Sequence, residues 1–156
     1  MKVRVLSVGT KMPGWVQEGV AEYKKRMQGD LDFSLIEIPM AKRTKNSNVI
    51  QCIQKESDAL LASIPASDYV IALDVEGKSF STENLAQKIV KFRQEGDNIS
   101  LLVGGPDGLG APCLARSNER WSLSALTFPH PLVRVVITEQ FYRAISLING
   151  HPYHRS

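Results

Sequence analysis

The chain has 156 residues, of which 43% are apolar and 22% charged, and its formal net charge at pH 7 is +3. These values are ordinary for a soluble globular protein of one domain, they exclude a histone-like charge density, and they permit an anionic partner. Cys52 and Cys113 lie far apart without metal-ligand spacing, which argues against a disulfide scaffold and for a reducing cytoplasm. No signal peptide is expected, nor is any run of about 18 apolar residues that would span a membrane.

Strand and helix patterns alternate through the first half of the chain. Val3 and Val5 alternate with charged neighbours before Gly9, which predicts a strand. Apolar residues then recur at helical spacing after Pro13, which predicts an amphipathic helix. The predicted elements of this half are a strand over residues 2–8, a helix over 14–27, a strand over 31–38 and a helix over about 47–63.

The second half continues the alternation. Its predicted elements are a strand over residues 69–73, a helix over about 81–92, a strand over 99–103, a strand over 121–125 and a helix over 132–148. The first and second of these strands are short apolar runs, typical of strands buried on both faces. Ser81 is the predicted N-cap of the intervening helix. The last segment contains three β-branched residues in a row, but its length and the closing Gly150 favour a helix.

This alternation predicts an α/β fold with a mainly parallel sheet and helices on both faces. In such sheets ligands bind outside the carboxyl ends of the strands. Three loops are expected at such ends, after Leu73, Val103 and Ala125.

The loop after Val103 is rich in glycine. The sequence LLVGGPDGLG runs from a buried strand into Gly104, Gly105, Gly108 and Gly110. Glycines let a backbone approach a ligand closely, but they also make tight turns, and both interpretations stay open. The spacing matches neither a Walker loop nor GxGxxG.

The third loop lies within LSALTFPHPLVR, residues 123–134, and is unusually apolar for a surface connection. It is suited to cradle a flat ring such as adenine with its backbone N–H and C=O groups. The alternative is a buried crossover without a ligand. His130 stands between two prolines, where a packed or solvated histidine is commoner than a catalytic one.

Charged and aromatic residues mark three further places. Lys42, Arg43 and Lys45 form a basic loop that either tracks phosphates or is simply solvated. Glu139 and Arg143 have the i,i+4 spacing of a helical ion pair. The chain ends in HPYHRS, which contains two of its three histidines; a frayed end is the alternative to a working tail.

Together these motifs resemble one family. The strand ending in LLVGGPDGLG, the segment WSLSALTFPHPLVRVVITEQFYRA, the terminal HPYHR, the opening VGTKMPGWV and the IEIP…KR segment are similar to the SPOUT class of methyltransferases. Within that class they resemble the small enzymes that methylate N3 of a pseudouridine in 23S ribosomal RNA. The resemblance covers essentially the whole chain.

The resemblance implies a single SPOUT domain over residues 1–156, with a C-terminal trefoil knot at about 70–150 and a tail at 151–156. It implies a cytoplasmic homodimer that acts on the ribosome and its 23S rRNA, without membrane contact. The implied methyl donor is S-adenosylmethionine, with no metal. The donor's predicted contacts are Leu73, Gly104, Leu123, Ser124, Ala125, Leu126, Thr127 and Phe128.

The resemblance assigns the tail, including His151, to substrate binding or catalysis near the methyl donor, with each site completed by the partner subunit. N3 of a uracil-type ring must lose a proton, which favours His154 as general base. Arg155 is the candidate clamp for the ring anion or a phosphate, and Tyr153 positions the base. Two other hypotheses are a SPOUT enzyme acting on transfer RNA and a non-catalytic ribosome-binding factor.

Overall fold

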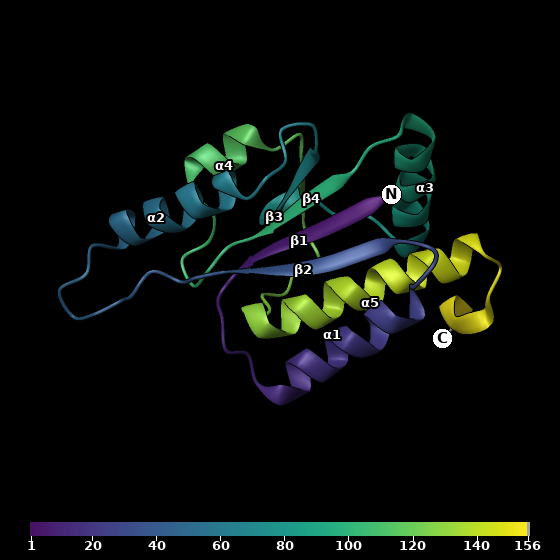
Figure 1. Ribbon diagram of the computed structural model, residues 1–156, viewed down its shortest axis with the longest axis horizontal. Helices are drawn as coiled ribbons and strands as arrows, with labels where there is room; N and C mark the ends of the chain where they lie inside the picture. The colour runs from purple at the N-terminus through teal and green to yellow at the C-terminus, as the bar shows by residue number, and fades with distance from the viewer. Residues whose placement is uncertain (156) are drawn as a thin grey trace.

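Five parallel strands form one sheet in the order β2-β1-β4-β3-β5 (Figure 1). The computed structural model describes the backbone of residues 1–155 and the side chains of residues 1–153. Its strands are β1 (Lys2–Val8), β2 (Asp32–Ile38), β3 (Tyr69–Lys78), β4 (Ile99–Val103) and β5 (Glu119–Trp121). Its helices are α1 (Gly14–Arg26), α2 (Val49–Ala62), α3 (Thr82–Glu95), α4 (Ala111–Arg116), α5 (His130–Ile148) and the short 3-10 helix η1 (Pro152–Arg155).

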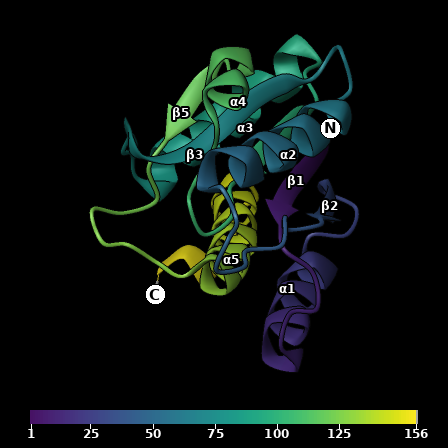
Figure 2. The same ribbon diagram turned by 90° about the vertical axis from the view of Figure 1, so that its left-hand side faces the viewer.

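Helices cover both faces of the sheet, as predicted. Alternate side chains of a strand point to opposite faces. Val3 and Val5 of β1 therefore belong to a core cluster shared with α3, α5 and Met27 at the end of α1, whereas Leu6 and Val8 belong to a cluster shared with α2 and α4. Figure 2 shows α2 and α4 on one side of the sheet and α1 and α5 on the other. The central strand β4 is buried along its whole length, as its apolar sequence predicts.

Local sequence signals set several helix ends. Ser81 caps α3 as predicted, and Asn84 completes a reciprocal capping box with it. Gly96 ends the same helix in the left-handed conformation, with φ of 72°. Asn48 caps α2 by accepting a hydrogen bond from the backbone N–H of Ile50 at 2.9 Å.

Four local predictions need correction. The strand predicted over 121–125 is β5, which ends at Trp121 because only residues 119–121 pair with β3, and 122–129 form a loop. β3 continues to Lys78, beyond the predicted end at 73, because Lys78 pairs again with Trp121 after an irregularity. α4 was not predicted, since it has only six residues with a proline in its first turn. α5 begins at His130 rather than 132.

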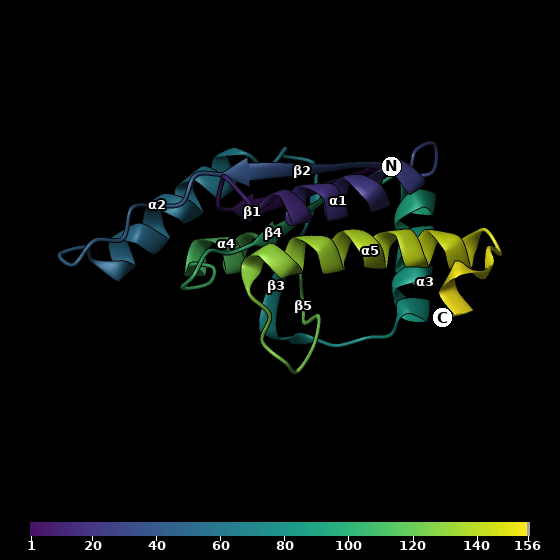
Figure 3. The ribbon, with the colours of Figure 1, turned by 90° about the horizontal axis from the view of Figure 1, so that it is seen from below.

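Parallel strands place all their following loops along one edge of the sheet. The loops 9–13, 39–48, 104–110 and 122–129 therefore follow carboxyl ends that meet at this edge. α5 starts there and runs 19 residues, about 28 Å at about 1.5 Å per residue. Figure 3 shows the loop from β5 entering α5 at one end and the C-terminal segment at the other. Within the described part of the chain, no helix has the length and apolar character needed to span a membrane.

Candidate active site at the carboxyl edge of the sheet

A cavity of about 750 Å³ lies at the carboxyl edge of the sheet. Its walls come from the middle of β3, the glycine loop after β4 and the loop between β5 and α5. The two loops are ones that the sequence singles out, whereas the loop predicted after Leu73 is part of β3, because that strand continues to Lys78. Seven of the eight predicted donor contacts line it, namely Leu73, Gly104, Leu123, Ser124, Leu126, Thr127 and Phe128, while Ala125 does not. The structure thus gathers these residues around one cavity, and their contact with a methyl donor stays a prediction.

The glycine loop is both a tight turn and a wall of this cavity, so the two interpretations of its sequence are compatible. The loop folds back so that Gly105 and Gly108 form an isolated bridge. A Cβ added to Gly104 would lie 2.6 Å from the carbonyl carbon of Gly108, closer than atoms can pack. Glycine is therefore required at position 104 for the loop to close in this way.

Trp121 forms a rigid part of the cavity wall. It is 2% exposed, it packs edge-on against Phe80 at 4.8 Å between ring centroids, and its Nε1 donates to Glu119 at 3.0 Å. Glu119 also accepts hydrogen bonds from Lys88 and Tyr69. Burial raises the pKa of this carboxyl, but the hydrogen bonds outweigh it and lower the pKa overall. Glu119 is therefore ionised at neutral pH and holds the indole in place.

The loop 122–129 supplies the apolar side of the cavity. The hydroxyl of Ser124 accepts a hydrogen bond from the backbone N–H of Leu126 at 3.0 Å, which fixes a local turn. Leu126 itself is 71% exposed although it lines the cavity. An exposed leucine beside an apolar cavity offers contact area to a bound molecule.

His130 and Arg134 join the start of α5 to the cavity and to β1 and β2. Arg134 is 1% exposed and donates to the carbonyl of Gly9 and to Glu37, both at 2.7 Å. His130 lines the cavity, and among the described residues its Nδ1 has no hydrogen-bond partner. Burial, with a smaller contribution from Arg134, lowers the pKa of His130, so this imidazole is neutral at pH 7.

The described part of the tail follows the C-terminal end of α5 and folds back against the middle of this helix. Tyr153 donates to Glu139 at 3.0 Å, and its ring packs on Tyr142 at 4.6 Å between centroids. The predicted pair of Glu139 and Arg143 is confirmed, at 2.6 Å. Burial and hydrogen bonds with Tyr23 and Glu139 raise the pKa of Tyr153, so its hydroxyl is protonated at neutral pH.

The remaining predicted tail residues are only partly described. The side chains of His154 and Arg155 lie outside the described residues, so their predicted roles stay predictions. His151 is exposed, and its Nδ1 accepts a hydrogen bond from the backbone N–H of Tyr153 at 3.3 Å. In the part of the chain that the structure describes, no three His, Cys, Asp or Glu side chains gather as a metal site requires.

Sequence reasoning missed Glu56 of α2. This carboxylate is 3% exposed and pairs with Arg43 of the predicted basic loop, while Lys42 and Lys45 of the same loop are exposed. The sequence signal for its burial is the spacing. Glu56 lies four residues from both Cys52 and Leu60, on the same apolar face of the helix.

Comparison with known proteins gives consistent matches over the full length. A family model described as "Predicted SPOUT methyltransferase" matches residues 1–154. A ribosomal RNA large subunit methyltransferase H of Marinomonas sp. (strain MWYL1) is 54% identical over 155 residues, which cover 99% of this chain and 100% of that protein. The protein of the same name from Hahella chejuensis (strain KCTC 2396) is 52% identical over 155 residues, 99% of each chain.

Solved structures show the same fold at much lower identity. A probable methylase family protein from Haemophilus influenzae Rd KW20 has a TM-score of 0.58 and 11% identity, covering 97% of this chain and 69% of that chain. A probable methyltransferase from Bordetella pertussis Tohama I has a TM-score of 0.57 and 14% identity, covering 92% of this chain and 95% of that chain. At these identities the likeness is one of fold alone.

Proposed function

The chain belongs to the SPOUT methyltransferase family and is an enzyme, and we propose that it transfers a methyl group from S-adenosylmethionine to N3 of a pseudouridine in 23S ribosomal RNA. The relatives that are 54% and 52% identical to this chain are named ribosomal RNA large subunit methyltransferase H, and the match covers 100% and 99% of their length. The observation that carries the proposal is the 750 Å³ cavity at the carboxyl edge, because three segments that are distant in sequence form it together.

The cavity suits the proposed methyl donor in size and chemistry. Pockets for ligands of this size measure roughly 300–1,000 Å³ and are mostly apolar with a few polar groups. Leu123, Leu126 and Phe128 supply apolar contacts for the adenine ring, and the backbone of the glycine loop lines the opposite wall. The close approach of Gly104 to Gly108 leaves that wall without side chains that would fill the space.

The chemistry divides between the donor and the chain. S-adenosylmethionine supplies, when bound, an electrophilic methyl group on a sulfonium. The chain's residues orient the donor and the acceptor ring and exclude water. His154 removes the N3 proton, Arg155 stabilises the ring anion or grips a phosphate, and Tyr153 positions the tail.

We propose further that the enzyme is a homodimer in which the tail of one subunit serves the cavity of the other. Within one subunit, the described tail begins beyond the far end of a helix that is about 28 Å long and starts at the cavity. From there the tail folds back along the helix, and Tyr153 is held against its middle by Glu139 and Tyr142. These contacts support a tail that reaches the reacting atoms in trans rather than in cis.

RNA binding is assigned to the exposed lysines of the loop 39–48. Lys42 and Lys45 are exposed in the loop 39–48, at the same sheet edge as the cavity. Such lysines contact phosphates without reading sequence, so binding weakens as salt rises. With a net charge of only +3, the shape of the ribosome supplies much of the specificity. The proposed enzyme acts in the cytoplasm. Its chain is proposed to form the trefoil knot of the family over residues 70–150, approximately.

The first test is calorimetric titration of the purified protein with S-adenosylmethionine. Saturable binding is expected, at one site per chain or one per dimer, and a ribosome-binding factor without catalysis predicts none. If the protein alone shows no binding, repeating the titration with ribosomes distinguishes a site formed only on the ribosome from a wrong proposal.

The second test identifies the acceptor. Transfer of labelled methyl groups to whole ribosomes and to transfer RNA is measured in parallel, and the labelled nucleoside is identified by mass spectrometry. Label in N3-methylpseudouridine of 23S rRNA supports the proposal. Label only in transfer RNA would replace it with the alternative enzyme.

A further inference from the structure

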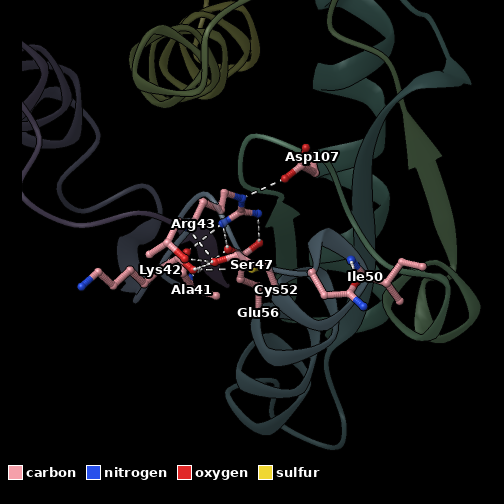
Figure 4. A network of polar contacts seen from close by, with 10 residues as sticks. Ala41, Lys42, Arg43, Ser47, Ile50, Cys52, Glu56 and Asp107 are labelled. Atoms are coloured by element: carbon pink, nitrogen blue, oxygen red, sulfur yellow. Dashed lines mark hydrogen bonds and ion pairs between the residues drawn. The ribbon is translucent and has the colours of Figure 1, made fainter.

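Arg43 links the second helix to the glycine loop through two carboxylates. Its guanidinium donates to Glu56 Oε1 at 3.0 Å and, through Nε, to Asp107 Oδ2 at 2.8 Å. Figure 4 shows Arg43 between these two acidic side chains, which belong to α2 and to the glycine loop. A planar guanidinium can hold two carboxylates in fixed directions, which a lysine ammonium cannot do as well.

The buried member of this network is Glu56. It is 3% exposed, and a buried carboxylate requires both a charge partner and hydrogen-bond donors. Arg43 supplies the charge, and the backbone N–H of Ala41 donates to Glu56 Oε2 at 3.0 Å. The hydrogen bonds with Glu56 and Asp107 raise the pKa of Arg43, so its charge is permanent.

The glycine loop packs closely against α2 near both ends of the loop. A Cβ added to Gly105 would lie 3.1 Å from Glu56 Oε1, and one added to Gly110 would lie 2.4 Å from the hydroxyl oxygen of Ser57. Between these two places, Asp107 stands out from the loop with 35% of its side chain exposed. Arg43 therefore adds a contact at Asp107, between the two places where the glycines approach α2.

The other side of this loop is the cavity wall. Gly104, Pro106, Asp107 and Leu109 line the cavity, whereas Arg43 does not. Ordering a glycine-rich segment costs conformational entropy. If the loop is already ordered before the ligand binds, less entropy is lost on binding and the affinity is higher.

We propose that Arg43 is a positioning residue for the cofactor site, which clamps Asp107 over α2 and so fixes the glycine loop as the cavity wall. The proposal rests on the proposed use of S-adenosylmethionine. It assigns a role in cofactor affinity to a residue of the loop 39–48, outside the cavity. It also places this residue between the two exposed lysines of the proposed RNA-binding loop.

Two variants separate clamping from folding. Asp107→Ala removes the exposed end of the clamp and leaves Glu56 paired. Arg43→Lys keeps a positive charge for Glu56 but cannot hold both carboxylates. Each is expected to weaken binding of S-adenosylmethionine by roughly five- to tenfold, with the melting temperature nearly unchanged, because an ion pair that is one-third exposed is worth little to overall stability. Asp107→Glu should restore part of the affinity.

The chain provides a matched control in Arg4 and Asp68. This pair has side-chain exposures of 21% and 2%, against 21% and 3% for Arg43 and Glu56, and it joins β1 to the residue before β3 at the opposite edge of the sheet. Arg4→Ala and Arg43→Ala should both lower the melting temperature, since each leaves a buried carboxylate unpaired. Only Arg43→Ala should also weaken cofactor binding.

Hydrogen exchange of the ligand-free protein provides a readout that does not need the cofactor. Amides of residues 104–110 should exchange faster in Asp107→Ala and Arg43→Lys than in the wild type, and at the wild-type rate in Arg4→Ala. If the wild type binds the cofactor and both clamp variants bind it equally well, the positioning role is wrong. An equal loss of affinity in Arg4→Ala would also overturn it. If the wild type binds the cofactor neither alone nor with ribosomes, the proposed cofactor fails, and the exchange rates alone decide whether the clamp exists.

Discussion

The start and the middle of α5 differ in what they contact. The first five residues include His130 at the cavity and Arg134, which is buried against Gly9 after β1 and Glu37 of β2. The middle of the helix carries an aromatic and charged cluster in which Tyr142 and Glu139 hold Tyr153 of the tail. One helix therefore separates the cavity from Tyr153 of the predicted catalytic tail.

This difference matters because a helix is a rigid spacer. Glu139 and Tyr142, which hold Tyr153, lie about 14 and 18 Å along the helix from His130, and bending cannot bring them together. The cavity end is fixed by hydrogen bonds to the sheet, whereas the tail end is fixed by packing on the helix itself. Binding of the methyl donor and catalysis by the tail should therefore be separable by mutation, and each end predicts a different loss.

The largest effect is expected at the tail. Replacing both His154 and Arg155 by Ala should reduce methyl transfer to ribosomes by roughly a hundredfold or more, because a general base and an anion stabiliser are lost together. The affinity for S-adenosylmethionine should stay within about twofold, since the cavity is at the other end of α5. Single-turnover transfer and calorimetry measure the two quantities. Removal of Ser156 alone is the control, and full-rate transfer by the double variant would refute the catalytic tail.

The opposite loss is expected at the cavity. Gly104→Ala places a Cβ where the carbonyl carbon of Gly108 lies 2.6 Å away, so the glycine loop must shift. We expect cofactor affinity to fall more than about tenfold, with the tail cluster intact. Calorimetry measures the affinity, and near-ultraviolet circular dichroism reports the tyrosine environment. Gly14→Ala is the control, because no atom lies within 4 Å of its added Cβ and its backbone is not in the left-handed region. If Gly104→Ala binds the cofactor with unchanged affinity, the glycine loop is not part of the cofactor site.

Mixing the two damaged proteins sharpens the comparison. If a tail serves the partner's cavity, a heterodimer of the Gly104→Ala chain and the His154→Ala, Arg155→Ala chain has one complete site. Equal mixing should then recover roughly a quarter of wild-type transfer, because half of the dimers are mixed and each holds one working site. The measurement is the rate after the two chains are unfolded and refolded together. No recovery, with mixed dimers shown by mass spectrometry, would favour a tail that acts in cis.

The smallest effect concerns pH. Burial lowers the pKa of His130 from its usual value of 6.5, so the unfolded chain binds a proton at a higher pH than the folded chain does. This contribution to stability is present above the usual pKa and is lost as pH falls from about 6.5 through the lowered pKa of the folded state. The melting temperature of His130→Asn should therefore fall less than that of the wild type when the pH is lowered from 7.5 to 5.5. Identical slopes would contradict the buried, neutral imidazole.

Sequence periodicity alone determined much of the architecture. The apolar run over 99–103 indicated a strand buried on both faces, and Ser81 marked the start of α3. These features are local, because side-chain alternation and capping depend on residues within one or two turns. The order of strands and helices then placed the two site loops, 104–110 and 122–129, at one edge of the sheet, since parallel strands place their following loops there.

The tertiary structure decided what depends on distant partners. β5 ends at Trp121 because only three of its residues pair with β3, although the sequence continues to look strand-like. Arg134 pairs across the fold with Glu37 rather than along its helix, and Arg43 finds Glu56 and Asp107 on two other elements. The separation of cavity and tail likewise depends on how α5 crosses the sheet. Local patterns determine which segments form, but contacts between segments far apart in sequence are chosen by packing and charge pairing in three dimensions.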